Sequence, residues 1–294
     1  MRRETFPANG KKEMKRVVRF DRWVTVHLAN PIVTLRGNDR SSRMPILMYH
    51  SVSCPDRFTD NEYFETSTSP DRFEMQMRLL SEGGYRGMNL SGLEGLRGGE
   101  YPSGNPRCFM LTFDDGFQDF KEEAFPILKE FGFSATVFLP TDYIGKTNRK
   151  FKGKECLTWG ETKELHKSGI EFGSHTLTHR ELRSLDRNEI RKEISESKMV
   201  IEDALGDAVR YFSYPYAFPE ADVEHTKYVK ETLVECGYRH CVTTAIGIPD
   251  AKSPGFYLKR LPVNHHDDEP FFLAKLSGGY DWLHGIQYLK KVLF

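Results

Sequence analysis

RCFMLTFDDG, residues 107–116, joins a continuous apolar run to two adjacent carboxylates and a glycine. An uninterrupted apolar run is typical of a strand that is buried on both faces, as in a parallel sheet. The run predicts a strand over residues 107–113 that delivers Asp114 and Asp115 at its C-terminal end. Gly116 lets the backbone turn there, so that both carboxylates can reach one point. Taken alone, the same three residues could equally form a turn or cap the next helix.

Short apolar runs alternate with longer amphipathic segments on both sides of this strand. We expect further strands at 46–49, 134–139, 170–172, 211–214, 239–243 and 257–263. We expect helices at 70–82, 117–131, 159–168, 186–205, 223–236, 270–276 and 282–293. Strands that alternate with helices in this way indicate an α/β fold with a parallel sheet, either a β/α barrel or an open sheet.

Polar side chains follow several of these strands at the point where each strand ends. In parallel α/β folds the C-terminal ends of the strands meet on one face and build the functional site there. We therefore expect the following residues to converge: His50, Asp114, Asp115, His175, His179 and Tyr216.

His175 and His179 lie four residues apart, which places both imidazoles on one side of a helical turn or a turn-like loop. The spacing alone is weak, because two unrelated surface histidines show it as well. Together with one carboxylate of the Asp114-Asp115 pair, however, the two imidazoles can hold one divalent metal and leave positions open. The other carboxylate then remains free to accept a proton, so the set suits a metal-assisted hydrolase.

The bulk composition is that of an ordinary globular protein. Lys and Arg number 42, Asp and Glu also number 42, and this balance does not indicate a nucleic-acid partner. Residues 1–43, however, carry eleven Lys or Arg against four Asp or Glu, a net charge of +7. We expect a basic N-terminal extension over 1–43, in which Pro31 interrupts any helix. The domain proper then spans 44–294.

The extension is either simply solvated or in peripheral contact with an anionic membrane surface. No apolar leader of secretory type is visible, and the five cysteines are scattered without a CxxC pair. These features predict a cytoplasmic protein with reduced thiols, placed at the inner membrane face if the extension contacts lipid.

Three motifs in this order resemble the NodB-homology polysaccharide deacetylases, carbohydrate esterase family 4: TFDDG at 112–116, SHTLTH at 174–179 and FSYPY at 212–216. The similarity extends from about residue 45 to about residue 276. It implies a distorted (β/α) barrel with about seven parallel strands. It also implies that Asp114 is the catalytic base, that Asp115, His175 and His179 hold one divalent metal, usually zinc, and that the Tyr216 backbone N–H stabilises the oxyanion.

The chain departs from the family pattern at two places. The third motif usually has an arginine, which tethers the catalytic base, where this chain has Ser213, and a glycine where it has Ala217. Arg260 is a candidate for the missing tether, although a surface arginine is an equally good interpretation. The motif near the C-terminus that supplies the acid histidine is also not evident.

The segment ILMYHSV at 46–52 resembles a circularly permuted subgroup that deacetylates poly-N-acetylglucosamine, in which the first strand supplies that histidine. By this resemblance His50 is the general acid, and His265 and His266 are the competing candidates. The implied reaction is hydrolysis of N-acetyl groups on an N-acetylhexosamine glycan or a lipid-linked sugar, releasing acetate. The alternatives are a non-catalytic carbohydrate-binding or assembly module on this scaffold and an amidohydrolase for a small amide.

Overall fold

The computed structural model describes residues 19–35, 43–54, 62–97, 107–250 and 253–293. Seven parallel strands close into a barrel, in the order β1, β12, β11, β10, β9, β6 and β5, because β5 pairs with both β6 and β1. These strands are β1 (Ile46–Tyr49), β5 (Arg107–Phe113), β6 (Thr136–Leu139), β9 (Glu171–Ser174), β10 (Tyr211–Ser213), β11 (His240–Ile246) and β12 (Phe256–Pro262). The predicted barrel of about seven parallel strands is confirmed.

Strand β5 is the seam of the barrel. One edge of β5 pairs with β1, and the other edge pairs first with β4 (Tyr85–Met88) and then with β6. Strand β4 lies outside the closed ring and was not predicted. Its four residues are mostly half-buried and show neither a continuous nor an alternating apolar pattern, so no strand signal is present.

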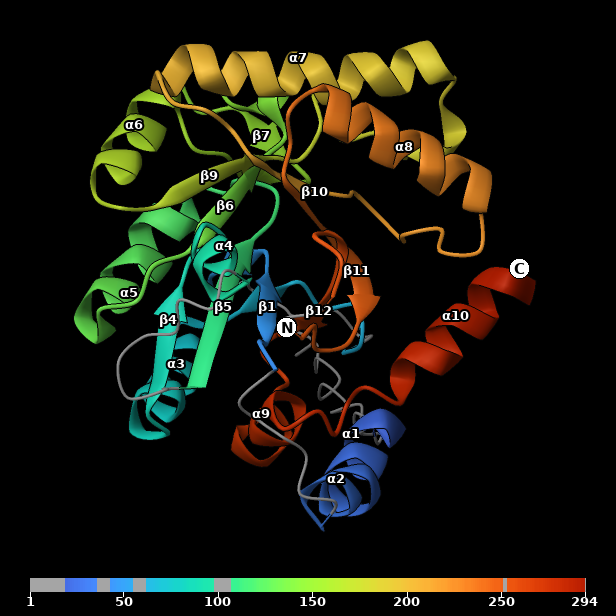
Figure 1. Cartoon of the computed structure of the whole chain (residues 1–294). Coiled ribbons are helices and arrows are strands. Elements are labelled where there is room, and N and C mark those ends of the chain that lie inside the picture. The colour runs from blue at the N-terminus through green and yellow to red at the C-terminus, as the bar shows by residue number, and fades with distance from the viewer. Residues whose placement is uncertain (1–18, 36–42, 55–61, 98–106, 251–252, 294) are drawn as a thin grey trace, which may run out of the picture.

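The helices lie around the outside of the barrel (Figure 1). They are α3 (Pro70–Glu82), α4 (Gly92–Arg97), α5 (Phe125–Phe131), α6 (Trp159–Lys167), α7 (Arg187–Leu205), α8 (Val223–Glu235), α9 (Glu269–Leu276) and α10 (Leu283–Leu293). One π-helical turn, η2 (Phe120–Ala124), precedes α5, and η3 (Thr141–Tyr143) and η4 (Leu182–Ser184) are short 3₁₀ turns. Local caps set the helix starts: Ser69 caps α3, while Thr158 and Asp186 form capping boxes with a glutamate three residues on.

Two pairs of very short strands lie outside the barrel. Strands β2 (Ser51–Val52) and β3 (Ser67–Thr68) pair in parallel, and β7 (Lys150–Phe151) pairs antiparallel with β8 (Lys154–Glu155). The turn of the β7–β8 hairpin consists of Lys152 and Gly153, both with positive φ, as tight two-residue hairpin turns require.

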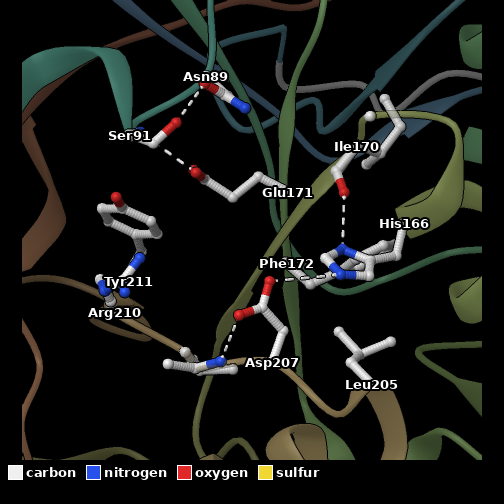
Figure 2. Close-up of a pocket in the computed structure, with 13 residues that line it drawn as sticks. Asn89, Ser91, His166, Ile170, Glu171, Phe172, Leu205, Asp207, Arg210 and Tyr211 are labelled. Carbon is white, nitrogen blue, oxygen red and sulfur yellow. Dashed lines mark hydrogen bonds and ion pairs between the residues drawn. The ribbon is translucent and has the colours of Figure 1, made fainter.

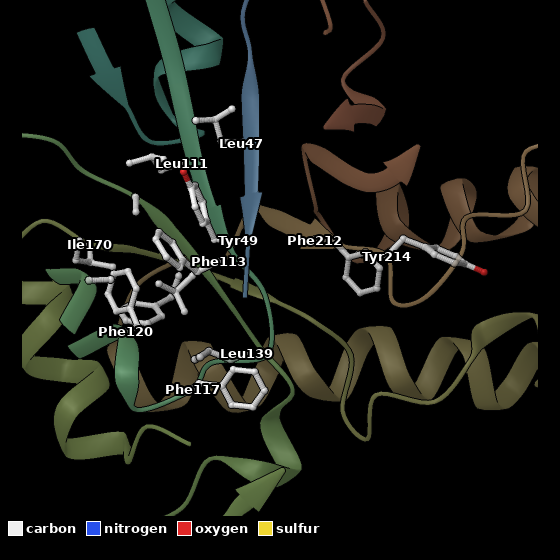
Figure 3. Packing of buried hydrophobic residues seen from close by; sticks show 14 of the residues in the cluster. Leu47, Tyr49, Leu111, Phe113, Phe117, Phe120, Leu139, Ile170, Phe212 and Tyr214 are labelled. Atoms are coloured by element: carbon white, nitrogen blue, oxygen red, sulfur yellow. The ribbon is translucent and has the colours of Figure 1, made fainter. Parts of the chain in front are cut away.

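Alternate residues of the barrel strands face the inside and the outside of the barrel. The outward set packs beneath the helices. Figure 3 shows Tyr49 and Phe113 of this set beside Phe120 of η2, with Tyr49 stacked on Phe113 at 5.4 Å between ring centroids. The inward set forms a second cluster. It includes Ile46, Met110, Phe138, Tyr211, Val242 and Leu258. Strand β9 contributes Gly173 to this interior, where an added Cβ would lie 2.5 Å from Phe138.

The N-terminal segment that the structure describes is helical from residue 20 to residue 35. It consists of α1 (Phe20–Val24), the π-helical turn η1 (Thr25–Ala29) and α2 (Asn30–Leu35). The expectation that Pro31 interrupts this helix was wrong. The wide π turn ends just before α2, so Pro31 lies in the first turn of α2, where its missing N–H would have no acceptor within that helix.

Residues 1–18 and 36–42 of the predicted extension lie outside the described residues, so the domain boundary at 43/44 stays a prediction. None of the described helices combines the length and the apolarity needed to cross a membrane.

Candidate active site

The two adjacent carboxylates diverge because the backbone turns sharply between them. Asp114 continues the line of β5, and its N–H donates to the Tyr49 carbonyl of β1. Asp115 then takes a left-handed conformation with φ 71°, followed by Gly116 with φ 59°. A Cβ at Gly116 would lie 2.8 Å from a methyl of Leu139, so glycine is required there for space as well as conformation. Each carboxylate therefore has its own partners.

Asp115 lies between the two histidines. Its Oδ1 is 3.2 Å from His179 Nε2 and 3.7 Å from His175 Nε2, and all three side chains are buried. One ligand atom from each residue lies within 4.8 Å of the others. The structure thus brings together the three residues that the sequence predicted as metal ligands.

The donor set fits a divalent metal. His175 Nδ1 is 2.8 Å from the Ser213 carbonyl, which orients the ring and leaves Nε2 for a ligand. Burial lowers the pKa of His175 to about 4, so the imidazole is neutral at pH 7, as a metal ligand must be. Asp115 Oδ1 is buried without a hydrogen-bond partner in the described structure, which a cation at this point would provide. Two imidazoles and one carboxylate are a familiar set for zinc.

The loop that carries both histidines is not helical. Thr176 and His179 both have positive φ, and the N–H groups of Leu177 and Thr178 donate to Glu193 of α7 at 2.9 and 2.8 Å. The buried Glu193 carboxylate therefore holds the loop between the two ligands. Glu193 was not predicted, because a glutamate in the middle of an amphipathic helix reads as a solvated residue.

Asp114 lies on the other side of the turn and contacts Arg260 rather than the histidines. Arg260 Nη1 and Nη2 donate to the two oxygens of Asp114 at 2.9 and 2.7 Å, and the Ser213 hydroxyl donates to Oδ1 at 3.1 Å. Burial by itself would raise the pKa of Asp114, but the Arg260 guanidinium outweighs it and holds the pKa well below its usual range. Asp114 is therefore ionised and fixed in orientation.

These contacts continue the inward-facing set of the barrel strands. Asp114, Ser213 and Arg260 follow Met110, Tyr211 and Leu258 at even spacing, so all three face the barrel interior at its C-terminal end. Arg260 is 0% exposed. The alternative interpretation of Arg260 as a surface residue is wrong, whereas its predicted role in supporting the base remains a hypothesis.

His50 follows β1 and is half-buried at the same end of the barrel. Burial lowers the pKa of His50, while the charges of Asp115 and Asp114 act in the opposite direction, so His50 lies within electrostatic range of both. His265 instead contacts Ser69, with 3.1 Å between Nδ1 and the hydroxyl oxygen, and the groups that act on its pKa include neither aspartate. His50 therefore lies nearer the two aspartates than His265 does, and its role as the acid stays a prediction.

Tyr216 and Lys152 complete the surroundings. The ring centroids of Tyr216 and His179 lie 4.8 Å apart, and the Tyr216 backbone has φ 57°. Within the described part of the chain, the Tyr216 N–H has no acceptor. Lys152, at the tip of the β7–β8 hairpin, places Nζ 3.0 Å from Asp115 Oδ2. The sequence did not predict Lys152, because nothing local connects the hairpin to β5.

Backbone strain is concentrated at this site. Six non-glycine residues of the described chain have positive φ, and five of them line the site or contact it: Asp115, Lys152, Thr176, His179 and Tyr216. Such conformations cost about 1–3 kcal/mol each and persist where a function needs the geometry.

A hollow of about 270 Å³ lies at the opposite end of the barrel (Figure 2). Its lining includes Glu171 and Tyr211, which are the first residues of β9 and β10. Glu171 there is already bonded to the Leu90 and Ser91 N–H groups. Because parallel barrels build their sites at the C-terminal ends of the strands, this hollow is not the active site.

Comparison with known proteins shows the family of this chain and supports its fold. The polysaccharide deacetylase family profile matches residues 102–240. YxkH of Bacillus subtilis (strain 168), which is assigned to the polysaccharide deacetylases, is 30% identical over 232 residues, covering 77% of this chain and 73% of YxkH. The chain therefore belongs to the polysaccharide deacetylase family, the NodB-homology enzymes that remove acetyl groups.

One further relative and two solved structures are also similar to this chain. The poly-β-1,6-N-acetyl-D-glucosamine N-deacetylase of Staphylococcus aureus (strain MSSA476) is 27% identical over 197 residues, covering 60% of this chain and 65% of the relative. Two solved structures share the fold, each at 24% identity over 80% of this chain. They are Streptococcus pyogenes deacetylase PplD in complex with acetate (TM-score 0.67, 98% of its chain) and IcaB from Ammonifex degensii (TM-score 0.64, 97% of its chain).

Proposed function

We propose that this protein hydrolyses N-acetyl groups on an N-acetylhexosamine-containing glycan, with one divalent metal, zinc, as its cofactor. The observation that carries the proposal is the pairing of a buried Asp115–His175–His179 triad with a separate carboxylate, Asp114, that Arg260 holds ionised. The substrate class is supported by the staphylococcal relative, which acts on poly-β-1,6-N-acetyl-D-glucosamine. A lipid-linked sugar of the same chemistry is an alternative substrate for the same site.

Asp115, His175 and His179 would hold the metal. When bound, a divalent metal polarises the acetyl carbonyl and lowers the pKa of a water at the site. Asp114 is in the right state to accept a proton from that water, because Arg260 keeps it unprotonated and Ser213 keeps it oriented.

The remaining residues act on the two ends of the amide. The Tyr216 N–H is available to donate a hydrogen bond to the oxyanion that forms as water attacks the carbonyl carbon. His50 would then protonate the nitrogen as the C–N bond breaks. The products are acetate and a free amine on the sugar, and the residues involved require no covalent enzyme intermediate.

Acetate release from N-acetylglucosamine oligomers tests this proposal. We expect release by zinc-loaded protein, and loss of at least 100-fold in an Asp114→Asn variant that still binds one metal. A His175→Ala variant should lose the metal and the activity together.

The same measurements separate the competing functions. Bound metal without acetate release from any acetylated sugar would favour an amidohydrolase for a small amide. Glycan binding without any metal would favour a non-catalytic carbohydrate-binding module. Either outcome would overturn the deacetylase proposal.

A further inference from the structure

The helical segment 20–35 presents an apolar stripe to solvent on one face. Its large side chains recur at steps of three, five, four and three residues, and the step of five crosses the wide π turn η1, so that all of them lie on the same side. Their exposed fractions are well above those of core residues. The apolar stripe consists of Phe20 (70%), Trp23 (46%), Leu28 (48%), Ile32 (48%) and Leu35 (86%).

The opposite face of this segment is fixed to the body of the protein. Trp282 Nε1 donates to the buried Thr25 hydroxyl at 3.1 Å, and the Tyr280 hydroxyl donates to Asp21 at 2.9 Å. Arg22 forms an ion pair with Asp268 at the start of α9. Val26 also packs against the apolar cluster that includes Ile246 and Phe271, so the segment carries apolar side chains on both faces and leaves the outward ones exposed. These contacts hold the segment in place with the apolar stripe facing solvent.

The charge of the adjoining sequence indicates which kind of partner contacts the apolar stripe. Residues 1–18 contain six Lys or Arg against two Asp or Glu, a net charge of +4, and they lead directly into the stripe. An amphipathic helix with a tryptophan and large aliphatic side chains on its apolar face, next to basic residues, binds the interface of an anionic bilayer. A second copy of the chain would instead bring two basic segments of the same sign together, which disfavours self-association through this face.

We propose that the apolar stripe docks on the surface of an anionic phospholipid bilayer, with the stripe side chains in the interface. This inference goes beyond the deacetylation reaction and does not depend on it. It would hold the barrel at a membrane surface through one helix face.

Vesicle co-sedimentation of the full chain tests the proposal. Vesicles would contain phosphatidylglycerol and phosphatidylcholine, or phosphatidylcholine alone as the uncharged comparison. The test variant is Leu28→Glu/Ile32→Glu, which changes exposed side chains only. The matched control is Val223→Glu/Val234→Glu on α8, where both valines are exposed (73% and 53%), and α8 lies at the far end of the molecule from α2 in Figure 1.

We expect wild type and control to bind anionic vesicles within about two-fold of one another, and the stripe variant to bind at least ten-fold more weakly. The control carries the same change of charge, so the difference reports the apolar contact alone. Thermal unfolding of both variants checks that each is folded, and Phe20→Ser/Leu35→Ser repeats the test without adding charge.

Three results would overturn the proposal. One is absence of wild-type binding to anionic vesicles at low salt. Another is an equal loss in both glutamate variants, which would assign binding to the basic residues alone. The third is a wild-type dimer that the stripe substitutions dissociate, because a second copy would then be what covers the stripe.

Discussion

Arg260 and Asp114 form a fully buried ion pair at the inner, C-terminal end of the barrel. Arg260 Nε also donates to the Thr243 carbonyl at 2.9 Å, and Nη1 donates to the Thr112 hydroxyl at 3.1 Å, so the guanidinium is bonded on every side. Removing one partner of such a pair leaves an uncompensated charge in the interior, which is far more costly than the pair is stabilising. Arg260 thus makes the contact with Asp114 that was predicted for a tether, while its role in supporting the base stays a prediction.

We expect Arg260→Met to lower the free energy of unfolding by about 3–5 kcal/mol. The pKa of Asp114 should rise in this variant because Arg260, the largest influence that opposes burial, is gone, and acetate release at neutral pH should fall by at least 100-fold. Arg260→Lys keeps the charge but loses the two-pronged contact, so its loss should be intermediate. Denaturant unfolding and acetate assays measure both effects, and full activity in Arg260→Met would exclude Arg260 from supporting the base.

Lys152 places a positive charge against the carboxylate that is predicted to hold the metal. The Lys152 ammonium is 3.0 Å from Asp115 Oδ2, and its side chain is 45% exposed. A metal at Asp115 would repel this ammonium, so the exposed Lys152 side chain would oppose metal binding unless it moved away.

Lys152→Gln should therefore bind zinc more tightly than wild type, because this repulsion is removed. The gain in affinity should be about two- to ten-fold, because solvent screens the exposed ammonium. Lys154→Gln is the matched control, since Lys154 lies in the same hairpin but bonds to Ser51 and Ser53 instead. Calorimetric titration of metal-free protein gives the affinities. Weaker zinc binding by Lys152→Gln would contradict this account.

At the scale of elements, helix α7 positions the metal-ligand loop. Glu193 accepts from two N–H groups of that loop and from the Thr178 hydroxyl, while Ser174 and Ser197 join β9 to the same helix at 2.7 Å. A rigid helix thus holds a loop that would be strained on its own, and the strain is the cost of bringing His175 and His179 together.

Glu193→Gln should weaken zinc binding by about ten-fold while the chain stays folded, because outer contacts of this kind orient metal ligands. Glu196→Gln, the same substitution three positions further along α7, serves as the control. Metal titration and thermal unfolding of both variants provide the measurement. Unchanged zinc affinity in Glu193→Gln would show that the loop keeps its shape without α7.

At the scale of the whole molecule, a second buried charge cluster joins the end of β12 to α9 and to the N-terminal segment. Lys275 donates to Asp267 Oδ2 at 2.7 Å, and Arg19 lies 3.7 Å from Asp267 Oδ1. Burial lowers the pKa of Lys275, and the charge of Asp267 acts against that decrease. This cluster connects the N-terminal segment, residues 19–35, to the barrel.

Asp267→Asn should lower the free energy of unfolding by about 3–5 kcal/mol at neutral pH, because Lys275 is then buried without its counter-charge. The penalty should shrink as pH rises toward about 10.4, the ordinary value of lysine. In the variant, Lys275 holds its proton more readily in the unfolded chain than in the folded protein. The free energy of unfolding of the variant therefore rises with pH relative to wild type.

Urea unfolding of both proteins across this pH range measures the difference. Asp268→Asn is the control, because Asp268 pairs with the half-buried Arg22 near the surface. A penalty in Asp267→Asn that grows with pH would contradict the assignment to Lys275.

Local patterns were sufficient for most of the fold. Strand β5 was predicted with its observed bounds, and the helices expected at 70–82 and 186–205 begin within one residue of α3 and α7. Strand β4 and the β7–β8 hairpin were missed, since their pairing partners, not their own residues, make them strands. The helix through Pro31 was missed because a π turn depends on how the segment packs.

Residue types and spacing alone predicted the seven barrel strands, the turn at Asp114-Asp115-Gly116 and the gathering of that carboxylate pair with His175 and His179. These features depend on residue types and spacing over a few positions, and on the rule that parallel strands end on one face. The contact of Arg260 with Asp114, 146 residues away along the chain, and the approach of Glu193 and Lys152 to the site follow from the folded arrangement and not from local sequence. Closure of the barrel decides these contacts, because it sets which strands become neighbours and which residues of each face inward.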